Sequence, residues 1–233
     1  SNPTWANHSP LLGSAGLKIE EYPYYDYDSH SVKFDEMIEC LSKIGSGDVV
    51  LLHGCCHNPC GADLNPEQWQ QVRDVALKQG FTVFIDLAYQ GLGDGLEEDV
   101  YGTRLLAESL PELIIVSSCS KNFGLYRERT GAMTMISDSA AAAAVATTQI
   151  AAAARAMYSM PPDHGAAIVQ LILSDDALRS QWDTELTEMR DRINGLRAQF
   201  VRQIQSIGID RDFSFIEREK GMFSFLGVNV DQV

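Results

Sequence analysis

The sequence predicts an α/β fold built on a mainly parallel β-sheet. Apolar runs of strand length occur at residues 48–53, 81–86 and 113–118, and stretches of helical character separate them. Strands that alternate with helices favour parallel pairing, because a helical crossover returns the chain to the same edge of the sheet. A chain of 233 residues is long enough for one large core and part of a second domain.

The elements follow in a regular order along the first half of the chain. The strand at 48–53 precedes a helix that opens at Pro66, a residue favoured in the first helical turn. The strand at 81–86 ends in a carboxylate and precedes a helix over residues 97–109. The strand at 113–118 is followed, after two small residues, by a lysine, so two strand ends carry polar side chains that would meet at one edge of the sheet.

Helices dominate after residue 138, beyond a further strand at 132–136. The longest predicted helix covers residues 174–205. Its apolar residues recur at helical spacing, and we expect them in the core: Leu178, Trp182, Leu186, Met189, Ile193 and Leu196.

Composition restricts the class of protein. The net charge of −14 argues against nucleic acid as a partner. The alanine-rich run at 140–154 is interrupted by polar residues and ends in a charge, so we expect no membrane span. The five cysteines form an odd set, which suits a reducing cytoplasm better than a disulfide framework.

Lys121 is the strongest candidate for chemistry. It follows the strand at 113–118 and small polar residues, and Gly124 and further cations come after it. A lysine that is withdrawn from water and close to other positive charge has a lowered pKa and becomes an amine nucleophile. Such an amine is what an aldehyde cofactor requires. The alternative, a surface lysine in a turn, would be favoured if no other signal accompanied it.

Asp86 and Tyr89 supply that further signal. A carboxylate at a strand end can pair with a protonated pyridine nitrogen, and a tyrosine three residues later can reach the phenolic oxygen of the same ring. Pyridoxal phosphate enzymes combine a lysine of this kind with an acidic partner for the pyridinium. Taken alone, Asp86 would be interpreted as a helix cap or loop residue.

A zinc site formed by Cys55, Cys56, His57 and Cys60 is not favoured. The usual spacing of cysteine pairs is missing, and adjacent residues of a strand point to opposite faces. A strand that runs into a turn at Asn58 is the better interpretation.

Six stretches of the chain resemble, in order, the class I (fold type I) aminotransferases that act on aspartate and aromatic amino acids. The stretches are residues 1–8, 51–61, 86–91, 118–129, 155–162 and 221–225. The resemblance implies a pyridoxal 5'-phosphate enzyme that moves an amino group between an aromatic amino acid, or aspartate, and 2-oxoglutarate. It also implies part of the seven-stranded large domain, the start of a small α/β domain, and an antiparallel strand at 132–136.

The resemblance also implies roles for individual residues. Lys121 would bind the cofactor and transfer the proton, Asp86 would pair with the ring nitrogen, and Tyr89 would reach the phenolic oxygen. Asn58 would contact that oxygen and the substrate. Trp5, which on sequence alone could be a core residue, would stack on the ring and contact substrate. The remaining expected residues are the phosphate ligands Ser118 and Arg129 and the supporting histidines His8 and His53.

Arg155 would cross the interface of a homodimer to meet the distal carboxylate of a substrate in the partner's site. The sequence around Met160 resembles that of the bacterial aromatic branch of the family. Cys60 stands where the family usually has threonine. An ion pair with Glu128 is an alternative for Arg129, although Arg127 suits that pair better. An aspartate-preferring enzyme, a decarboxylase or lyase of the same fold, and a scaffold without catalysis are the alternatives for function.

The expected domains are residues 1–188, the incomplete cofactor domain, and residues 189–233, a linking helix with the start of the small domain. We interpret the chain as an internal fragment of a longer enzyme. The phosphate-binding loop, a tyrosine from the partner subunit and the arginine for the substrate's α-carboxylate would lie outside it. We therefore do not expect these 233 residues by themselves to turn over substrate.

Overall fold

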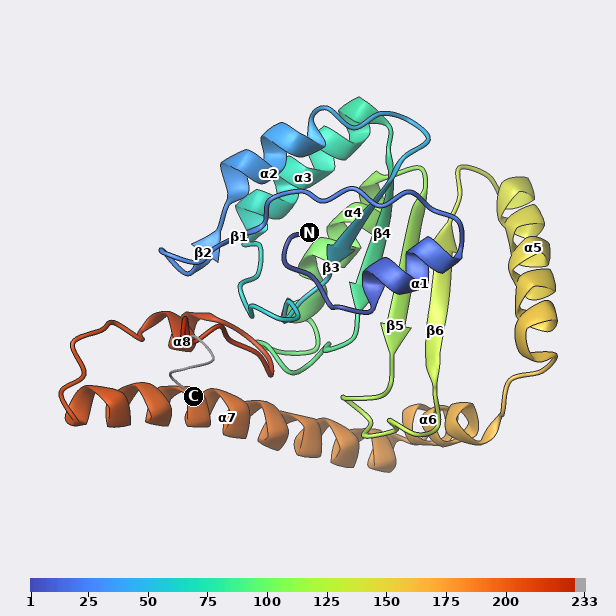
Figure 1. Ribbon diagram of the computed structural model, residues 1–233. Helices are drawn as coiled ribbons and strands as arrows, with labels where there is room; N and C mark the ends of the chain where they lie inside the picture. Colours follow the sequence, from blue (N-terminus) through green and yellow to red (C-terminus); the bar gives the residue numbers. More distant parts are fainter. Residues whose placement is uncertain (229–233) are drawn as a thin grey trace.

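A computed structural model of the chain describes residues 1–228. Its centre is a four-stranded sheet in the order β3 (Val49–His53), β4 (Thr82–Leu87), β5 (Leu113–Ser118) and β6 (Gly131–Ile136) (Figure 1). The first three strands are parallel, and β6 runs antiparallel to β5. The predicted α/β fold with a mainly parallel sheet is confirmed, and so is the single antiparallel strand.

Helices and a short hairpin surround this sheet. Figure 1 shows the second and third helices together at the upper left, the fourth helix behind the strands β3 and β4, and the first helix drawn across the strands β5 and β6. The elements outside the sheet, up to β5, are α1 (His8–Ser14), β1 (Tyr25–Asp26), β2 (Ser31–Val32), α2 (Phe34–Leu41), α3 (Pro66–Gln79), the 3-10 turn η1 (Glu98–Val100) and α4 (Tyr101–Ser109).

Helix α3 begins where the sequence predicts, at Pro66. The Asn65 side chain accepts a hydrogen bond from the Gln68 backbone at 2.8 Å, and the Gln68 side chain accepts one from the Asn65 backbone at 2.9 Å. This reciprocal capping box satisfies two backbone donors that the helix itself leaves free. The helix ends at Gly80, which has a left-handed φ of 77°.

The core lies between the sheet and helices α3 and α4. Alternate residues of β4, Val83 and Ile85, are fully buried and pack with Leu52 of β3. Gly102 brings α4 close to α3, since a Cβ at this position would lie 2.2 Å from the ring of Trp69. The strands are therefore held on a rigid base, and their carboxyl ends are free to carry the site.

Four helices follow β6: α5 (Ala140–Tyr158), α6 (His164–Ser174), α7 (Asp176–Ser206) and α8 (Phe215–Arg218). Figure 1 shows α7 running below the carboxyl ends of the parallel strands, with α6 beside its start and α5 standing apart beyond β6. None of the described residues forms a helix long and apolar enough to cross a membrane.

The long helix α7 matches the predicted one within two residues at each end, but its apolar stripe is only partly core. Leu186 is buried, and Trp182, Met189 and Ile193 pack against the core. Two expected core residues are exposed instead: Leu178 at 37% and Leu196 at 57%. The predicted boundary at residue 188 falls inside this helix and stays a prediction. The last five residues of the predicted second domain lie outside the described residues.

Candidate active site

The site residues gather at the carboxyl ends of the parallel strands. His53 ends β3 and pairs in register with Asp86 of β4, and Ser118 ends β5. Parallel strands present these ends at one edge, so residues 32 or more positions apart in the sequence become neighbours. The strand order, rather than any local sequence pattern, brings them together.

A chain of hydrogen bonds holds the Asp86 carboxylate. His8 Nε2 lies 3.0 Å from Asp86 Oδ2, and Thr4 Oγ1 lies 2.8 Å from His8 Nδ1 and 3.1 Å from His53 Nε2. Burial lowers the pKa of His53 well below its usual value, and neighbouring His57 lowers it further. His53 is therefore neutral, and through Thr4 it helps to fix the ring of His8. Thr4 connects the two predicted supporting histidines, and sequence reasoning missed it because nothing in its spacing marks a bridge.

The amine of Lys121 lies between two tyrosines. Its Nζ is 5.0 Å from the ring centroid of Tyr89 and 5.9 Å from that of Tyr126. Burial lowers the pKa of Lys121; Asp86 opposes this effect and Arg129 adds to it. A lowered lysine pKa increases the share of the free amine, which is the nucleophilic form. Sequence reasoning did not predict Tyr126 as a site residue.

Asn58 and Tyr89 form a pair across the site. The Asn58 side-chain amide donates to the Tyr89 hydroxyl at 3.3 Å. Burial raises the pKa of Tyr89, and the hydrogen bond from Asn58 opposes that rise. The Tyr89 ring lies 5.0 Å from Lys121 Nζ, so a planar ring bound beside them would meet an amine and a phenol.

Asp63 organises the turn that carries Asn58, and the sequence did not single it out. Its two carboxylate oxygens accept the backbone N–H groups of Cys56 at 2.6 Å and His57 at 2.8 Å. Burial raises the pKa of Asp63 to about 6, and the two backbone hydrogen bonds oppose this rise. The carboxylate thus holds the backbone on the approach to Asn58.

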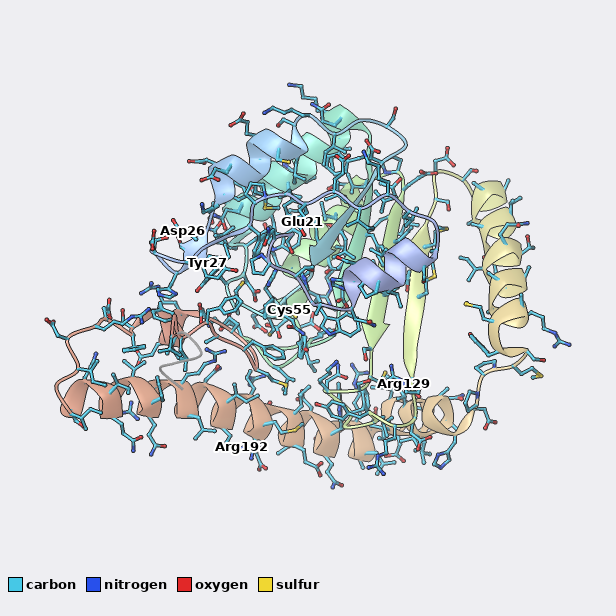
Figure 2. The ribbon with its side chains drawn as sticks, viewed as in Figure 1. Glu21, Asp26, Tyr27, Cys55, Arg129 and Arg192 are labelled. Atoms are coloured by element: carbon cyan, nitrogen blue, oxygen red, sulfur yellow. The ribbon has the colours of Figure 1, made fainter. Side chains whose placement is uncertain are left out.

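Ser118 and Arg129 lie beside the lysine loop. Ser118 Oγ accepts the N–H of Ser120 at 3.1 Å, and Arg129 Nη1 donates to the carbonyl of Tyr126 at 2.9 Å. Figure 2 shows Arg129 near the lower ends of β5 and β6. The rest of its guanidinium remains exposed, which suits an anion, because a planar fork binds phosphate oxygens in pairs.

Glu128 does not pair with either neighbouring arginine. Its carboxylate lies 3.1 Å from Nδ1 of His164 at the start of α6. The alternative of an ion pair between Glu128 and Arg129 or Arg127 is not favoured in the described residues, because the fold places a helix start within reach of the carboxylate instead. This leaves Arg129 available for the anion that the sequence predicts.

The cysteines after β3 do not behave as strand residues. Cys55 and Cys56 follow the strand end at His53, and Cys56 has a left-handed φ of 50°. Their sulfur atoms and a carboxylate oxygen of Asp99 lie within 4.8 Å of one another, so the expectation that the thiols point to opposite faces is wrong. A metal is still not favoured, because the Asp99 carboxylate already accepts the backbone N–H groups of Gly91, Gly93, Asp94 and Gly95.

Comparisons with known proteins agree with this arrangement. The family described as aminotransferase class I and II matches residues 1–232. The chain belongs to this aminotransferase family. It is 50% identical to the aspartate aminotransferase of Escherichia coli and 44% identical to the aromatic-amino-acid aminotransferase of Paracoccus denitrificans, in each case over 100% of this chain and 59% of the relative.

A solved structure shows the same fold. The aromatic-amino-acid aminotransferase of Burkholderia pseudomallei, covalently bound to pyridoxal phosphate, superposes with a TM-score of 0.96 at 44% identity. The match covers 97% of this chain and 57% of that one. The chain thus spans about three fifths of the length of the aminotransferases that it matches, and relatives named for aspartate and for aromatic amino acids both occur among them.

The donor set of this aminotransferase chain fits pyridoxal phosphate. An amine of lowered pKa, a carboxylate held by histidine and a phenol paired with an amide surround one space, and a hydroxyl and a guanidinium lie at its edge. These groups match an aldehyde, a ring nitrogen, a phenolic oxygen and a phosphate in turn. The residues that could hold the cofactor are Lys121, Asp86, Asn58, Tyr89, Ser118 and Arg129.

Two predicted site residues, Trp5 and Arg155, have few contacts with the other site residues. Trp5 is 42% exposed and packs edge-on to His8 at 5.2 Å, so the interpretation of Trp5 as a core residue is wrong. Its ring contacts His8, the residue whose Nε2 lies 3.0 Å from the Asp86 carboxylate. Arg155 sits in the last turn of α5, a helix with no buried residue in the described chain, and the structure does not bring it to the other site residues.

Proposed function

We propose that the full-length enzyme is a pyridoxal phosphate-dependent aminotransferase. It would transfer the amino group between an aromatic L-amino acid, or aspartate, and 2-oxoglutarate. The observation that carries the proposal is the shared space of three groups: the lysine amine of lowered pKa, the carboxylate held by His8, and the Asn58–Tyr89 pair. Family membership and relatives named for both substrate groups support it.

Each residue has a task that follows from its surroundings. When bound, pyridoxal phosphate supplies an aldehyde carbon and an electron-poor ring that stabilises negative charge at the substrate's α-carbon. Lys121 Nζ would accept the proton that leaves this α-carbon, because its lowered pKa favours the free amine. Asp86, oriented by His8, would hold a proton at the ring nitrogen, and Asn58 with Tyr89 would bind the phenolic oxygen.

The substrate contacts and the assembly are part of the same proposal. Trp5, with its exposed ring, and Asn58 would contact the substrate's α-carboxylate side. Arg155 lies on an apolar helix without a buried residue in the described chain, which supports a homodimer in which this arginine reaches the partner's site. All five cysteines are free in residues 1–228, which supports a cytoplasmic enzyme.

The first test is covalent mapping of the cofactor. The full-length enzyme is incubated with pyridoxal phosphate, reduced with borohydride and digested for mass spectrometry. We expect a pyridoxyl mass on the peptide that contains Lys121 and none in Lys121→Ala, with Lys78→Ala, an exposed lysine of α3, as the matched control. An adduct elsewhere, or none, would contradict the assignment of the cofactor site.

The second test identifies the reaction. Lys121→Ala should lower the rate of 2-oxo acid formation from an aromatic amino acid or aspartate by roughly 10⁴-fold, since a positioned acid–base group contributes up to that factor. Release of carbon dioxide or ammonia in place of a 2-oxo acid would favour the decarboxylase or lyase. Binding of the cofactor without any turnover would favour the scaffold.

A further inference from the structure

Arg197 of α7 is a buried arginine that binds backbone carbonyls. Its exposed fraction is 9%, and it forms no salt bridge within residues 1–228. A buried charge is tolerated only when hydrogen bonds replace the lost water. Its donors reach the carbonyls of Ile216 (3.0 Å), Lys220 (3.4 Å), Gly221 (2.6 Å) and Phe223 (2.6 Å) and the hydroxyl of Ser224 (2.5 Å).

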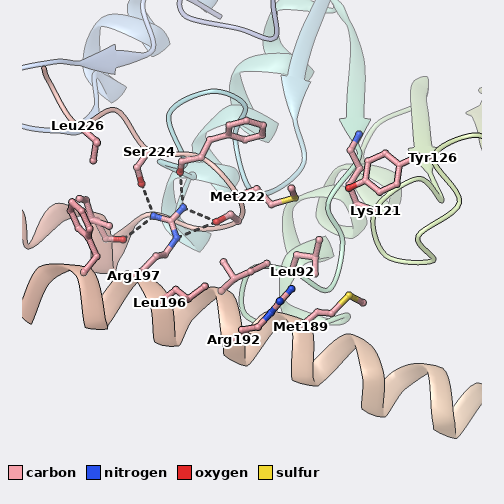
Figure 3. A pocket seen from close by; sticks show the side chains of 15 residues that line it. Leu92, Lys121, Tyr126, Met189, Arg192, Leu196, Arg197, Met222, Ser224 and Leu226 are labelled. Atoms are coloured by element: carbon pink, nitrogen blue, oxygen red, sulfur yellow. Dashed lines mark hydrogen bonds between the residues drawn. The ribbon is translucent and has the colours of Figure 1, made fainter. Parts of the chain in front are cut away.

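All of these acceptors lie in one segment, residues 216–224. Figure 3 shows the guanidinium at the centre of this segment, with the dashed hydrogen bonds spreading from it. Lysine could not replace this pattern, because an ammonium lacks the planar fork that reaches several fixed carbonyls at once. Arg197 therefore fixes the backbone conformation of residues 216–224 through its hydrogen bonds.

The 216–224 segment interlocks with the turn over residues 54–61. Lys220 N donates to the carbonyl of Gly61 at 2.7 Å. A Cβ on Gly61 would lie 2.4 Å from the carbonyl oxygen of Phe223, and a Cβ on Gly221 would lie 2.5 Å from Cβ of Cys56. The two backbones are thus in direct contact at two glycines, so a shift of the segment must move the turn.

The turn and the segment both reach the candidate site. Asn58, in the turn, donates to the Tyr89 hydroxyl, and the ring of Phe223, in the segment, meets the Tyr89 ring edge-on at 6.0 Å. Arg197 is therefore separated from Tyr89 by one residue, Phe223, whose carbonyl it binds. It is linked to Asn58 through Lys220 and Gly61.

We propose that Arg197 is a positioning residue for the Asn58–Tyr89 pair, acting through the 216–224 segment. The proposal rests on the proposed function, since the pair matters for chemistry only if it binds the cofactor's phenolic oxygen. Its structural part, the coupling of α7 to the 54–61 turn, can be measured without the cofactor. The two parts therefore fail separately.

The structural part is tested by hydrogen exchange on the full-length protein without pyridoxal phosphate. The variant is Arg197→Lys, and the control is Arg192→Lys. Arg192 is exposed and, like Arg197, lines a groove of about 490 Å³ beside α7. We expect amides of residues 54–61 to exchange about tenfold faster in Arg197→Lys, as for loss of one charge-assisted hydrogen bond, while β4 keeps its protection. Unchanged exchange in the turn, or an equal loss across β4, would overturn the coupling.

The functional part is tested on the enzyme with pyridoxal phosphate bound. The pH midpoint of the cofactor's absorbance change depends on the groups at its phenolic oxygen, so we expect it to move in Arg197→Lys and to stay in Arg192→Lys. We also expect kcat to fall about tenfold with a smaller change in KM, since small misplacements of site groups have effects of this size or larger. Normal spectra and kcat in a destabilised Arg197→Lys would reduce Arg197 to a purely structural residue and overturn the proposal.

Ser224→Ala provides a milder variant if Arg197→Lys folds poorly. It removes only one acceptor of the guanidinium, so the same changes should appear at a smaller amplitude. Failure of the wild-type enzyme to bind pyridoxal phosphate would sink the proposed function, yet the hydrogen-exchange comparison would still decide the coupling. An unchanged turn in both variants would end the proposal whatever the cofactor result.

Discussion

The turn over residues 54–61 and helix α5 differ strongly in packing. Cys56, His57 and Cys60 of the turn are almost completely buried, whereas α5 has no buried residue. Both regions carry predicted site residues, Asn58 and Arg155. Asn58 is held by contacts within this chain, but Arg155 has its position set only by the helix that bears it. In the proposed enzyme, the residues for the cofactor are held within this chain, whereas the proposed contact of Arg155 with a substrate carboxylate would depend on a partner that covers α5.

The packing of the turn can be broken most directly at Gly61. Gly61→Ala should lower the free energy of unfolding by about 2–4 kcal/mol, because Gly61 has a φ of 73° and a Cβ would lie 2.4 Å from a backbone oxygen. Gly195→Ala in α7 is the control, since no atom lies within 4 Å of its Cβ position, and it should stabilise by about 0.5–1 kcal/mol. Urea unfolding measures both. If Gly61→Ala leaves the free energy of unfolding unchanged, the turn and the 216–224 segment are not interlocked.

Acid should weaken the same turn through His57. Burial lowers the pKa of His57 to about 3, so the folded protein binds this proton less readily than the unfolded chain, whose value is 6.5. The stabilisation is complete above pH 6.5 and is lost as the pH falls toward 3. Between pH 7 and pH 5 the free energy of unfolding should lose about 2 kcal/mol through this residue.

The comparison of wild type with His57→Gln isolates this effect. Asp63, whose pKa is raised to about 6, works in the opposite direction, because its contribution is lost as the pH rises through 6. Both proteins contain Asp63, so its effect cancels in the difference. A His57→Gln profile parallel to wild type would show that His57 takes up protons in the fold as it does in water.

The smallest effect on stability is expected at α5. Arg155→Ala should change the free energy of unfolding of this chain by less than about 0.5 kcal/mol, because the side chain is exposed and forms no described contact that folding would lose. In the full-length enzyme the same change should raise KM for a dicarboxylate substrate by about 10- to 100-fold, as for a lost charge-assisted contact. A large loss of stability in the isolated chain, or an unchanged KM, would contradict the role assigned to this arginine.

Sequence reasoning succeeded where a signal is local. The strands β3 to β6 and the helix α7 were predicted within one or two residues, because apolar runs and helical spacing depend on neighbouring positions. It failed where burial depends on other elements. Leu178 and Leu196 continue the apolar stripe of α7 but are exposed, since a stripe shows which face can be covered and not whether it is.

The site shows the same division. Lys121, Asp86 and Tyr89 could be assigned from their places at strand ends and from a family resemblance. Thr4 and Asp63 could not, because their importance lies in single hydrogen bonds to residues that only the fold brings near. The mutual approach of Cys55 and Cys56 was also hidden, since it depends on a left-handed φ at a residue other than glycine.

The sequence by itself determined the α/β class and the order of the strands' polar ends, and it carries the prediction of Lys121, because these follow from residue type and spacing along one chain. Only the tertiary structure decided which side chains hold those groups in place. Arg197 reaches the site through carbonyls of a segment some 20 residues away in sequence, and Asn58 and Tyr89 meet across two strands. Such contacts arise when packing fixes distances between segments, and composition and periodicity carry no information about those distances.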